Sequence, residues 1–482
     1  MNAILIGVLG IFILKGLSST VADPDLWGYL AFGRLFWVSG KFPYQDVYSY
    51  VPTLNPWVYH EWLTGVVFYP LYGKTGGVGL QILKYLFGLL TVALMYLTAR
   101  KRGASPLGAA GGLFITSGFL MIGYSPVRAQ IFTYFFFTLT LYLLEQVRLT
   151  RRWQVMGVIP IFMIIWCNLH GGFVAGLGLI ALYALGEALA RRSFLPYLGI
   201  LFLSGIATLV NPYGLRYLGY ILHAITMPRP EITEWGSIFL LSRPGISLLE
   251  VVYYFLIIII SLLLMWWGKW REITVSLTLG VTLYIGLAHV RHMVFFLILV
   301  GAYIPVILTP FLQGIMSWPW VITLRYRLRW SIPAVLALIL LCYGSYNLLH
   351  HAPWTLQTPS QPMEDKNGIY YPVAAINFIR TSNLSGNLLI HFDWGEYALW
   401  NLYPQCRVAL DGRYETVYPE SVAKEYFDFL FGRDNWQRFL EHYPPDMILI
   451  KIPSKIHSVL QKEPHWRQVF ADSGSALFLC RN

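Results

Sequence analysis

Residues 20–40 read TVADPDLWGYLAFGRLFWVSG. This stretch places two carboxylates, Asp23 and Asp25, directly after an apolar run (residues 3–19) and before a series of aromatic residues. Carboxylates beside hydrocarbon are unfavourable, so they are retained there mainly for function. The alternative is a structural role, because Asp25 precedes a predicted helix and Pro24 suits the turn before it. The motif alone leaves both interpretations open.

The composition is that of a membrane protein. The chain has 482 residues, of which 56% are hydrophobic and 12% charged, and its mean hydropathy is +0.54. Soluble domains carry about twice that share of charge. The net charge of +11 comes mainly from basic residues at the ends of apolar runs. We interpret it as a topology signal and as attraction to anionic membrane lipids, not as a nucleic-acid surface.

Eleven apolar runs are candidates for transmembrane helices, which need about 20 residues each. They cover residues 3–19, 77–99, 107–124, 130–147, 155–169, 172–190, 194–210, 247–267, 273–289, 293–312 and 331–349. The predicted fold is therefore an α-helical polytopic membrane protein with about eleven transmembrane helices. A shorter apolar segment, 59–73, is interrupted by Pro70 and predicts a helix that dips into the lipid without crossing it.

Basic clusters lie between alternate spans. They are Arg100-Lys101-Arg102, Arg148/Arg151/Arg152, Arg191-Arg192, Lys269/Arg271 and Arg325/Arg327/Arg329. Because positive loops stay cytoplasmic, we expect a plasma (inner) membrane protein with a cytoplasmic N-terminus and an extracytoplasmic C-terminal tail. The first run could be a cleaved signal peptide, but it lacks a basic leading region and is long enough to span. An uncleaved anchor is therefore the better prediction.

The C-terminal tail predicts a small α/β domain. Strand-like stretches at Leu388–Phe392, Arg407–Leu410, Met447–Ile450 and Ala476–Leu479 alternate with helical patterns at 373–382, 419–431 and 434–442. We divide the chain into a transmembrane domain (1–350, with interfacial helices in a first external loop at 20–58), a linker (351–372) and an extracytoplasmic domain (373–482). Whether Cys406 and Cys480 form a disulfide in this last domain stays open.

Several motifs after the first span resemble those of the GT-C glycosyltransferases, integral membrane enzymes that use polyprenyl-phosphate-linked sugars. They are Asp25-x-Trp27-x-Tyr29, Pro43-x-x-Asp46 and Trp57-x-x-His60-Glu61-Trp62. A similar loop in oligosaccharyltransferase catalytic subunits reads Asp-Pro-Trp-Phe-Asn-Tyr and places that family's catalytic-site aspartate on Asp25. The Asp-Glu pair of protein-mannosyltransferase-like members resembles Asp23 and Asp25 more loosely. The overall layout is similar to the RgtA/B/C/D-like group of bacterial membrane proteins.

A second resemblance lies in the tail. Asp393-Trp394-Gly395-Glu396-Tyr397, followed by Val408-Ala409-Leu410-Asp411-Gly412, looks like the Trp-Trp-Asp-Tyr-Gly segment and downstream Val-Asp of oligosaccharyltransferases. The match is imperfect, because Phe392 replaces a tryptophan and Trp394 follows the aspartate. Binding of a peptide sequon is therefore not carried over. Turn roles are the simpler interpretation for Asp393 and Asp411.

The resemblance implies an inverting glycosyltransferase at the outer face of the membrane, where nucleotide-sugars are absent. Its donor would be a polyprenyl-phosphate-linked hexose or pentose, and its acceptor a lipid, a glycan or a protein. Asp25, with Asp23, would align the acceptor and take its proton. Arg128, Arg291 and His292, at outer ends of spans, would bind the donor phosphate and stabilise its charge. The alternative for the arginines is snorkelling to the lipid interface.

Further candidates for substrate binding are His60, Glu61, His170, Glu231 and Glu234. His60 and Glu61 could instead secure the lipid-dipping helix, and His170 could belong to a hydrogen-bonded turn with Asn168. A divalent cation (Mg or Mn) could be held by Asp25 and Glu234. Related enzymes that need a metal carry an acidic pair in the second external loop. Here that loop, 124–128, contains Arg128 and no acid, so metal dependence stays open and an arginine can supply the positive charge.

Other functions remain as alternatives. An O-antigen ligase or polymerase also uses outward arginine and histidine residues but needs no acidic motif after the first span. A transporter tends to have repeated halves and spans broken at matching positions, and neither is visible here. A non-catalytic scaffold of the cell envelope would not need polar residues gathered on one face. A glycosyltransferase is therefore the main prediction.

Overall fold

The computed structural model describes residues 2–239, 248–268, 271–327, 331–359 and 370–481. The chain divides into two compact units. The first contains residues 1–20, 81–214 and 225–355, and the second contains residues 21–80, 215–224 and 356–482. The segment that follows the first helix therefore belongs to the same unit as the C-terminal tail.

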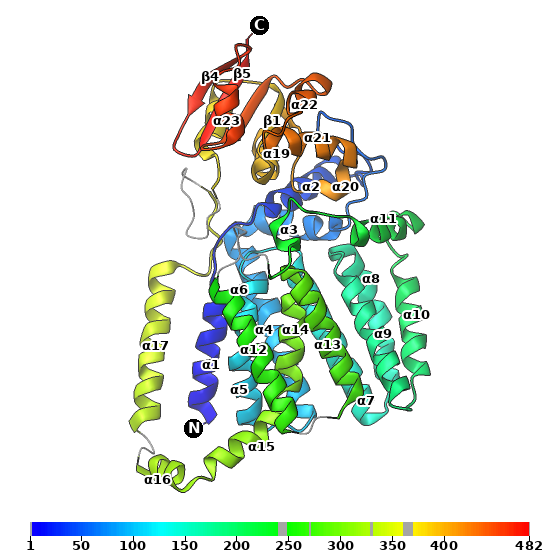
Figure 1. The fold of residues 1–482 in the computed structure, drawn as a ribbon, viewed down its shortest axis with the longest axis vertical. Coiled ribbons are helices and arrows are strands. Elements are labelled where there is room, and N and C mark those ends of the chain that lie inside the picture. Colours follow the sequence, from blue (N-terminus) through cyan, green and yellow to red (C-terminus); the bar gives the residue numbers. More distant parts are fainter. Residues whose placement is uncertain (1, 240–247, 269–270, 328–330, 360–369, 482) are drawn as a thin grey trace. The chain divides into compact units, whose positions relative to one another are not determined.

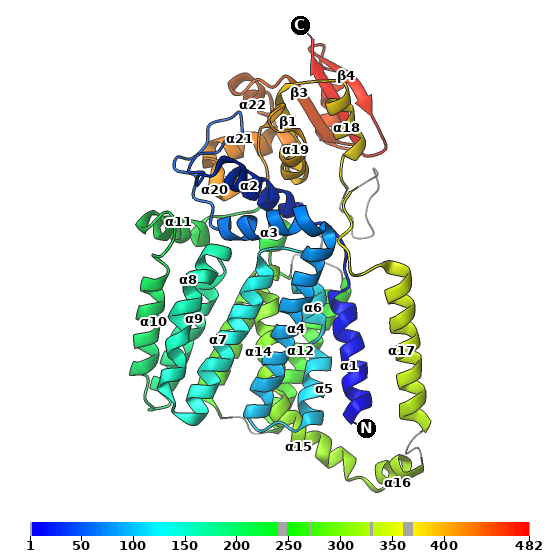
Figure 2. The same ribbon diagram turned by 180° about the vertical axis from the view of Figure 1, so that it is seen from behind.

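The first unit consists of helices, and its long helices lie side by side (Figures 1 and 2). They are α1 (Asn2–Leu17), α4 (Gly77–Lys101), α5 (Pro106–Thr116), α6 (Gly118–Gly123), α7 (Gln130–Thr150), α8 (Ile159–Leu169), α9 (Phe173–Leu189), α10 (Leu195–Ala207), α12 (Leu248–Trp267), α13 (Ile273–Ala288), α14 (Met293–Tyr303), α15 (Pro305–Met316), α16 (Pro319–Arg327) and α17 (Ser331–His351). Each predicted apolar run falls on one helix or on two consecutive ones. Residue 247, Lys269, Arg329 and residues 360–369 of the predicted linker lie outside the described residues.

Length and hydropathy identify few of these helices as membrane spans. Within the described ranges, α4 is the one helix long and apolar enough to cross a membrane by itself. The pair Val290–Tyr303 and Pro305–Met316, bent by 52°, adds a second if it forms one broken span. The bend falls where Pro305 cannot continue the helical hydrogen bonding. Most other apolar helices have only 10–17 residues, so this measure does not confirm eleven transmembrane helices.

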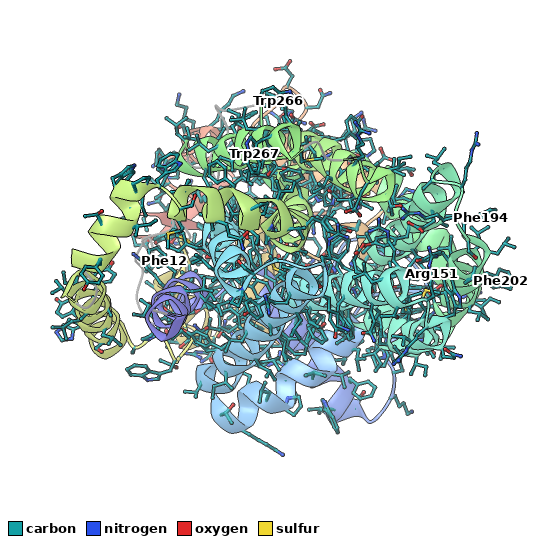
Figure 3. The ribbon with its side chains drawn as sticks, turned by 90° about the horizontal axis from the view of Figure 1, so that it is seen from below. Phe12, Arg151, Phe194, Phe202, Trp266 and Trp267 are labelled. Carbon is teal, nitrogen blue, oxygen red and sulfur yellow. The ribbon has the colours of Figure 1, made fainter. Side chains whose placement is uncertain are left out.

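Large apolar side chains lie on the outside of the first unit. Figure 3 shows Phe202 of α10 and Trp266 of α12 at its outer edge, and these side chains are 68% and 81% exposed. Ile161 and Leu263 are also more than half exposed. Apolar surface of this extent is typical of a protein face that lipid or another protein covers.

Five charged residues form a network where α7, α9 and α13 meet. Arg102 and Arg148 both pair with Glu145 and with Glu272, and Arg148 also donates to Glu187 at 3.0 Å. All of these side chains except Glu272 are buried. Both arginines were counted above among the topology charges, but three carboxylates surround them in the structure. They therefore present little net positive charge to either side of a membrane.

Replacing Glu145 with glutamine should lower the free energy of unfolding by about 3 kcal/mol, because two buried guanidinium groups lose a counter-charge. Thermal or denaturant unfolding of the purified protein measures the loss. Arg192→Gln is the matched control, since Arg192 faces Glu187 at 3.8 Å but is 48% exposed. This control should lose less than about 1 kcal/mol. Equal losses in the two variants would show that burial of the network does not stabilise these helices.

The tail of the second unit is an α/β domain. Its sheet has the order β2-β1-β3-β5-β4; β2, β1 and β3 are parallel, and β5 is antiparallel to β3 and β4. The elements are α18 (Val373–Thr381), β1 (Gly386–Ile390), α19 (Gly395–Leu402), β2 (Cys406–Val408), α20 (Tyr414–Val417), α21 (Glu420–Leu430), α22 (Gln437–His442), β3 (Met447–Lys451), α23 (Lys455–Leu460), β4 (Trp466–Ala471) and β5 (Ser475–Cys480).

All four predicted strands and all three predicted helices of the tail are confirmed. Strand β4 was not predicted, because it lies at the edge of the sheet and its partly exposed side chains give no apolar run. Helices α19, α20 and α23 were also missed, since they have only four to eight residues. Cys406 and Cys480 are both free thiols.

Helices α2 (Asp25–Ser39) and α3 (Trp62–Thr75) belong to the second unit. α2 packs against α3 and α19, and Trp27, Tyr29 and Phe32 are all buried. These three residues, with Phe36 and Trp37, were the basis for predicting an interfacial helix, and of the five Trp37 is exposed. In the structure the first three pack inside the protein, because α3 on one side and α19 on the other cover them.

The segment between α2 and α3 also joins the sheet. Ser49 forms a parallel bridge with Val408 at the end of β2. The Val408 N–H donates to Tyr48 O at 2.9 Å, and its carbonyl accepts from Tyr50 N–H at 3.2 Å. This segment therefore extends the sheet beyond β2, so that Asp25 and the tail strands are parts of one folded structure.

Candidate functional site

Two residues that follow β1 and β2, Glu396 and Gly412, lie beside Asp25. Residues 391–396 follow β1, and residues 409–413 follow β2. Ligands of open parallel sheets commonly bind at this edge. Asp25 is the first residue of α2, and its backbone N–H donates to Asp23 Oδ1 at 3.0 Å. The two aspartates of the sequence motif therefore shape one turn at the start of this helix.

Glu396 of the tail holds the start of α2. Its Oε2 accepts the Gly28 N–H at 3.0 Å, one of the amides that a helix leaves unpaired in its first turn. A Cβ built on Gly412 would lie 2.9 Å from Glu396 Oε1 and 3.3 Å from Asp25 Oδ1. The two carboxylates therefore border one small space, which any side chain at position 412 would fill.

Arg413 neutralises the other acids nearby. Its Nε and Nη2 donate to the two oxygens of Asp411 at 2.8 and 2.6 Å, and its Nη1 donates to Asp46. The guanidinium also lies about 5 Å from the ring centroids of Tyr48 and Trp57. Asp411 also accepts the Arg413 N–H at 2.9 Å. These contacts agree with the predicted turn role of Asp411.

Burial raises the pKa of Glu396 well above its usual value, and the charges of Asp25 and Asp411 raise it further; Arg413 and the Gly28 N–H act in the opposite direction. Glu396 therefore keeps a proton more readily than an exposed glutamate. A proton-carrying carboxyl beside the Asp25 carboxylate is an arrangement that can exchange a proton with a substrate hydroxyl.

Glu396→Gln should make the protein more stable at pH 8, by about 2 °C in melting temperature. The raised pKa means that the contribution of Glu396 is fully present below its unfolded pKa of 4.5 and is lost as the pH rises through its folded pKa. Glutamine keeps an oxygen for the Gly28 N–H and has no proton to lose. Melting curves from pH 4.5 to 9 measure this, and Glu396→Ala, which removes the acceptor, should be destabilised at every pH. Parallel pH profiles for wild type and Glu396→Gln would contradict the raised pKa.

His60 and Glu61 lie at the start of α3 in the same unit. His60 Nε2 is 3.6 Å from Glu61 Oε1, and His60 Nδ1 is 3.0 Å from the hydroxyl of Tyr220, whose ring stacks on the imidazole. Tyr220 lies on α11 (Leu215–Thr226). His60 thus ties α3 to α11, and its role in substrate binding stays a prediction.

The cationic candidates lie in the first unit, around Glu234. Arg128 Nη1 is 3.1 Å from Glu234 Oε2, and Arg291 Nη1 is 3.4 Å from Glu234 Oε1. The Arg291 Cζ atom lies 4.5 Å from the ring centroid of Trp235. The ring centroids of Trp235 and His292 are 5.8 Å apart. The structure therefore brings together four residues that the sequence placed in three separate segments.

Burial raises the pKa of Glu234, but Arg128 and Arg291 outweigh that effect and lower the pKa to about 2. Glu234 is therefore a carboxylate near pH 7 and can pair with both arginines. His292 lies beside Arg291 in the chain, and its ring is 5.6 Å from that of His289. In its neutral form it can act as a hydrogen-bonding group.

His170 is part of a turn. Its Nδ1 accepts the Gly172 N–H at 2.9 Å and lies 2.7 Å from the Thr133 hydroxyl, which in turn accepts from the indole of Trp166 at 2.8 Å. The predicted turn role of His170 thus accounts for the contacts of its Nδ1 atom. Glu231 lies two residues beyond Arg229 in the same segment as Glu234, and its predicted role stays a prediction.

Sequence reasoning missed three residues of these clusters. Glu396 and Arg413 contact the segment 21–80 from far along the chain, and Trp235 contacts two cations, since Arg229 is also 4.3 Å from its ring centroid. Glu396 belongs to the tail motif quoted above, which is the one signal that could have found it. Lys84 was also overlooked: it is buried within α4 and donates to the carbonyl oxygens of Ser19 and Ser125.

The described residues contain no group of three or more His, Cys, Asp or Glu side chains arranged to hold a metal ion. Asp25 and Glu396 offer two carboxylates at the start of α2, but Arg413 already takes the oxygens of Asp411. Metal dependence stays open, because Mg²⁺ is commonly bound through one or two carboxylates together with substrate phosphates.

No protein-family model and no curated protein matches the chain. Among solved structures it is similar to the oligosaccharyltransferase AglB of Archaeoglobus fulgidus in complex with an inhibitory peptide and a dolichol-phosphate. That similarity has a TM-score of 0.57 at 12% sequence identity and covers 93% of this chain and 69% of AglB. A complex of the A. fulgidus oligosaccharyltransferase with Zn and sulfate gives 0.56 at 13%, over 93% and 68%. At this identity the similarity shows the fold alone: the chain is folded like these oligosaccharyltransferase structures.

Proposed function

We propose that this protein is an inverting glycosyltransferase that moves a sugar from a polyprenyl-phosphate-linked donor to an acceptor at the outer face of the plasma membrane. The observation that carries the proposal is the position of Asp25. It begins α2, its turn is formed with Asp23, and a buried carboxyl, Glu396, holds the same helix end. A helix end built in this way within a GT-C-like fold is suited to a catalytic carboxylate.

The proposed function requires that the helical unit is embedded in a membrane. The exposed apolar side chains of α8, α10 and α12 are suited to contact with lipid. The N-terminus would be cytoplasmic, with the α/β tail outside. The solved AglB structure contains a dolichol-phosphate, a lipid of the same chemical class as the polyprenyl phosphate that the proposed reaction releases.

The chemistry needs one displacement. An acceptor oxygen or nitrogen attacks the anomeric carbon while the bond from that carbon to the phosphate oxygen breaks. The electron pair leaves with the phosphate, giving polyprenyl phosphate, and the proton of the nucleophile passes to the Asp25 carboxylate. Attack opposite the leaving group inverts the anomeric configuration.

Arg128, Arg291 and His292 are the proposed partners of the donor phosphate. Guanidinium groups match phosphate oxygens in geometry and stabilise the charge that builds up as the bond breaks. A neutral His292 can donate one further hydrogen bond. The acceptor is a lipid, a glycan or a protein, and His60, Glu61, His170 and Glu231 are proposed to contact substrate.

Asp25→Asn should reduce sugar transfer by at least about 100-fold, because the amide cannot take the acceptor's proton. The assay incubates purified protein with a set of polyprenyl-phosphate sugars and membrane-extract acceptors, and it follows release of polyprenyl phosphate. Asp434→Asn, at an exposed turn of the tail, removes the same charge and should transfer at the wild-type rate. If Asp25→Asn is expressed normally and transfers sugar at a near-wild-type rate, Asp25 is not the catalytic base.

A comparison of two variants separates this function from an O-antigen ligase or polymerase. The proposed enzyme needs both Asp25 and Arg291. Loss of transfer in Arg291→Ala with retention in Asp25→Ala would favour the ligase or polymerase, which needs no acidic group after the first helix.

A further inference from the structure

Glu234 occupies the point where Arg128 and Arg291 converge. Each arginine contacts a different oxygen, at 3.1 and 3.4 Å, and the Glu234 side chain is 33% exposed. A carboxylate bridged in this way by two guanidinium groups has the charge and the forked geometry of a phosphate. The site as it stands therefore holds an anion that belongs to the protein itself.

The segment around Glu234 allows this anion to leave. Glu234 lies in a single 3-10 turn, Thr233–Trp235, so its position does not depend on a long helix. Trp235 has contacts that do not involve Glu234 or its partners, because its ring centroid is 4.3 Å from the Arg229 guanidinium and its carbonyl oxygen is 2.7 Å from His289 Nδ1. The Glu234 side chain can therefore swing away while Trp235 retains its contacts.

His292 provides a second, independent indication of a ligand. Its Nδ1 is buried and has no hydrogen-bond partner in the part of the chain that the structure describes. A buried polar atom is rarely left unpaired. The Nδ1–H of a neutral imidazole can donate to a phosphate oxygen, and the Glu234 carboxylate leaves this atom unused.

We propose that Glu234 is an internal counter-ion of the phosphate site, which the lipid phosphate displaces on binding and which returns to expel the product. The inference rests on the proposed function. The donor is a phosphodiester with one negative charge. The product is a phosphate monoester, whose charge approaches two near pH 7. Repulsion by Glu234 scales with the ligand's charge, so the returning carboxylate disfavours the product more than the donor.

Glu234→Gln should bind farnesyl phosphate, a short isoprenyl monoester, about tenfold more tightly than wild type at low salt, because a like charge is removed from the site. Titration of the purified full-length protein measures the affinity. Glu234→Asp retains the charge and should stay within about threefold of wild type. Glu420→Gln, at an exposed position of the tail, controls for net charge and should not change the affinity. Unchanged or weaker binding by Glu234→Gln, or no binding by any variant, would overturn the proposal.

The charge argument has its own test in the methyl ester of farnesyl phosphate, a phosphodiester. The gain in affinity of Glu234→Gln over wild type should be smaller for the diester than for the monoester. In transfer assays, the concentration of polyprenyl phosphate that halves the rate should fall in Glu234→Gln. An equal gain for both esters would show that Glu234 does not discriminate product from donor.

A measurement on wild type alone covers the case in which the variants do not fold. Farnesyl phosphate should speed hydrogen exchange of the amides at 233–235, because the ion pairs of Glu234 break, and slower exchange would oppose the displacement. These outcomes are separable from the proposed function. If Glu234→Gln binds phosphate more tightly but the protein transfers no sugar, the displacement of Glu234 by phosphate is supported and the glycosyltransferase function is contradicted. If the protein transfers sugar but Glu234→Gln binds phosphate as the wild type does, the glycosyltransferase function is supported and the role of Glu234 as a counter-ion is contradicted.

Discussion

The guanidinium of Arg413 connects two parts of the second unit that are far apart in the chain. It donates to both oxygens of Asp411, three residues after β2, and to one oxygen of Asp46 in the segment between α2 and α3, and all three side chains are buried. A buried ion pair contributes specificity only when each partner is satisfied, since an unpaired buried charge is strongly unfavourable. The segment 21–80 can therefore dock on the tail in few arrangements other than the one that closes these contacts.

This docking determines the surroundings of the Asp23–Asp25 motif. Glu396 reaches the first turn of α2 from the tail and accepts the Gly28 N–H, while Gly412 leaves room for two carboxylates. The positive end of the α2 dipole favours acids at this position, which offsets part of their desolvation. Asp25 is thus held by residues of the tail, and the tail is part of the structure that positions the proposed base.

The two clusters have opposite electrostatic character. Around Asp25 carboxylates outnumber cations, whereas around Glu234 arginines outnumber carboxylates. Displacement at an activated sugar needs a base for the nucleophile and positive charge for the departing phosphate, so a chain with both kinds of cluster has the chemical groups that the reaction requires. In the cationic cluster the protein provides its own anion, which keeps the arginines paired until a stronger anion arrives.

The apolar runs by themselves determined where the helices lie, because a stretch without polar groups hydrogen-bonds its own backbone and packs or inserts as a helix. The sequence likewise indicated four of the five strands, and it showed the acidic motif Asp23–Asp25 after the first helix. Only the tertiary structure decided that Trp27 and Tyr29 lie in a protein core, that three carboxylates surround Arg102 and Arg148, and that Glu396 and Arg413 border the motif. Local periodicity reports which face of an element is apolar but not which distant segment covers it. The partner of a buried charge is therefore decided only when the chain has folded.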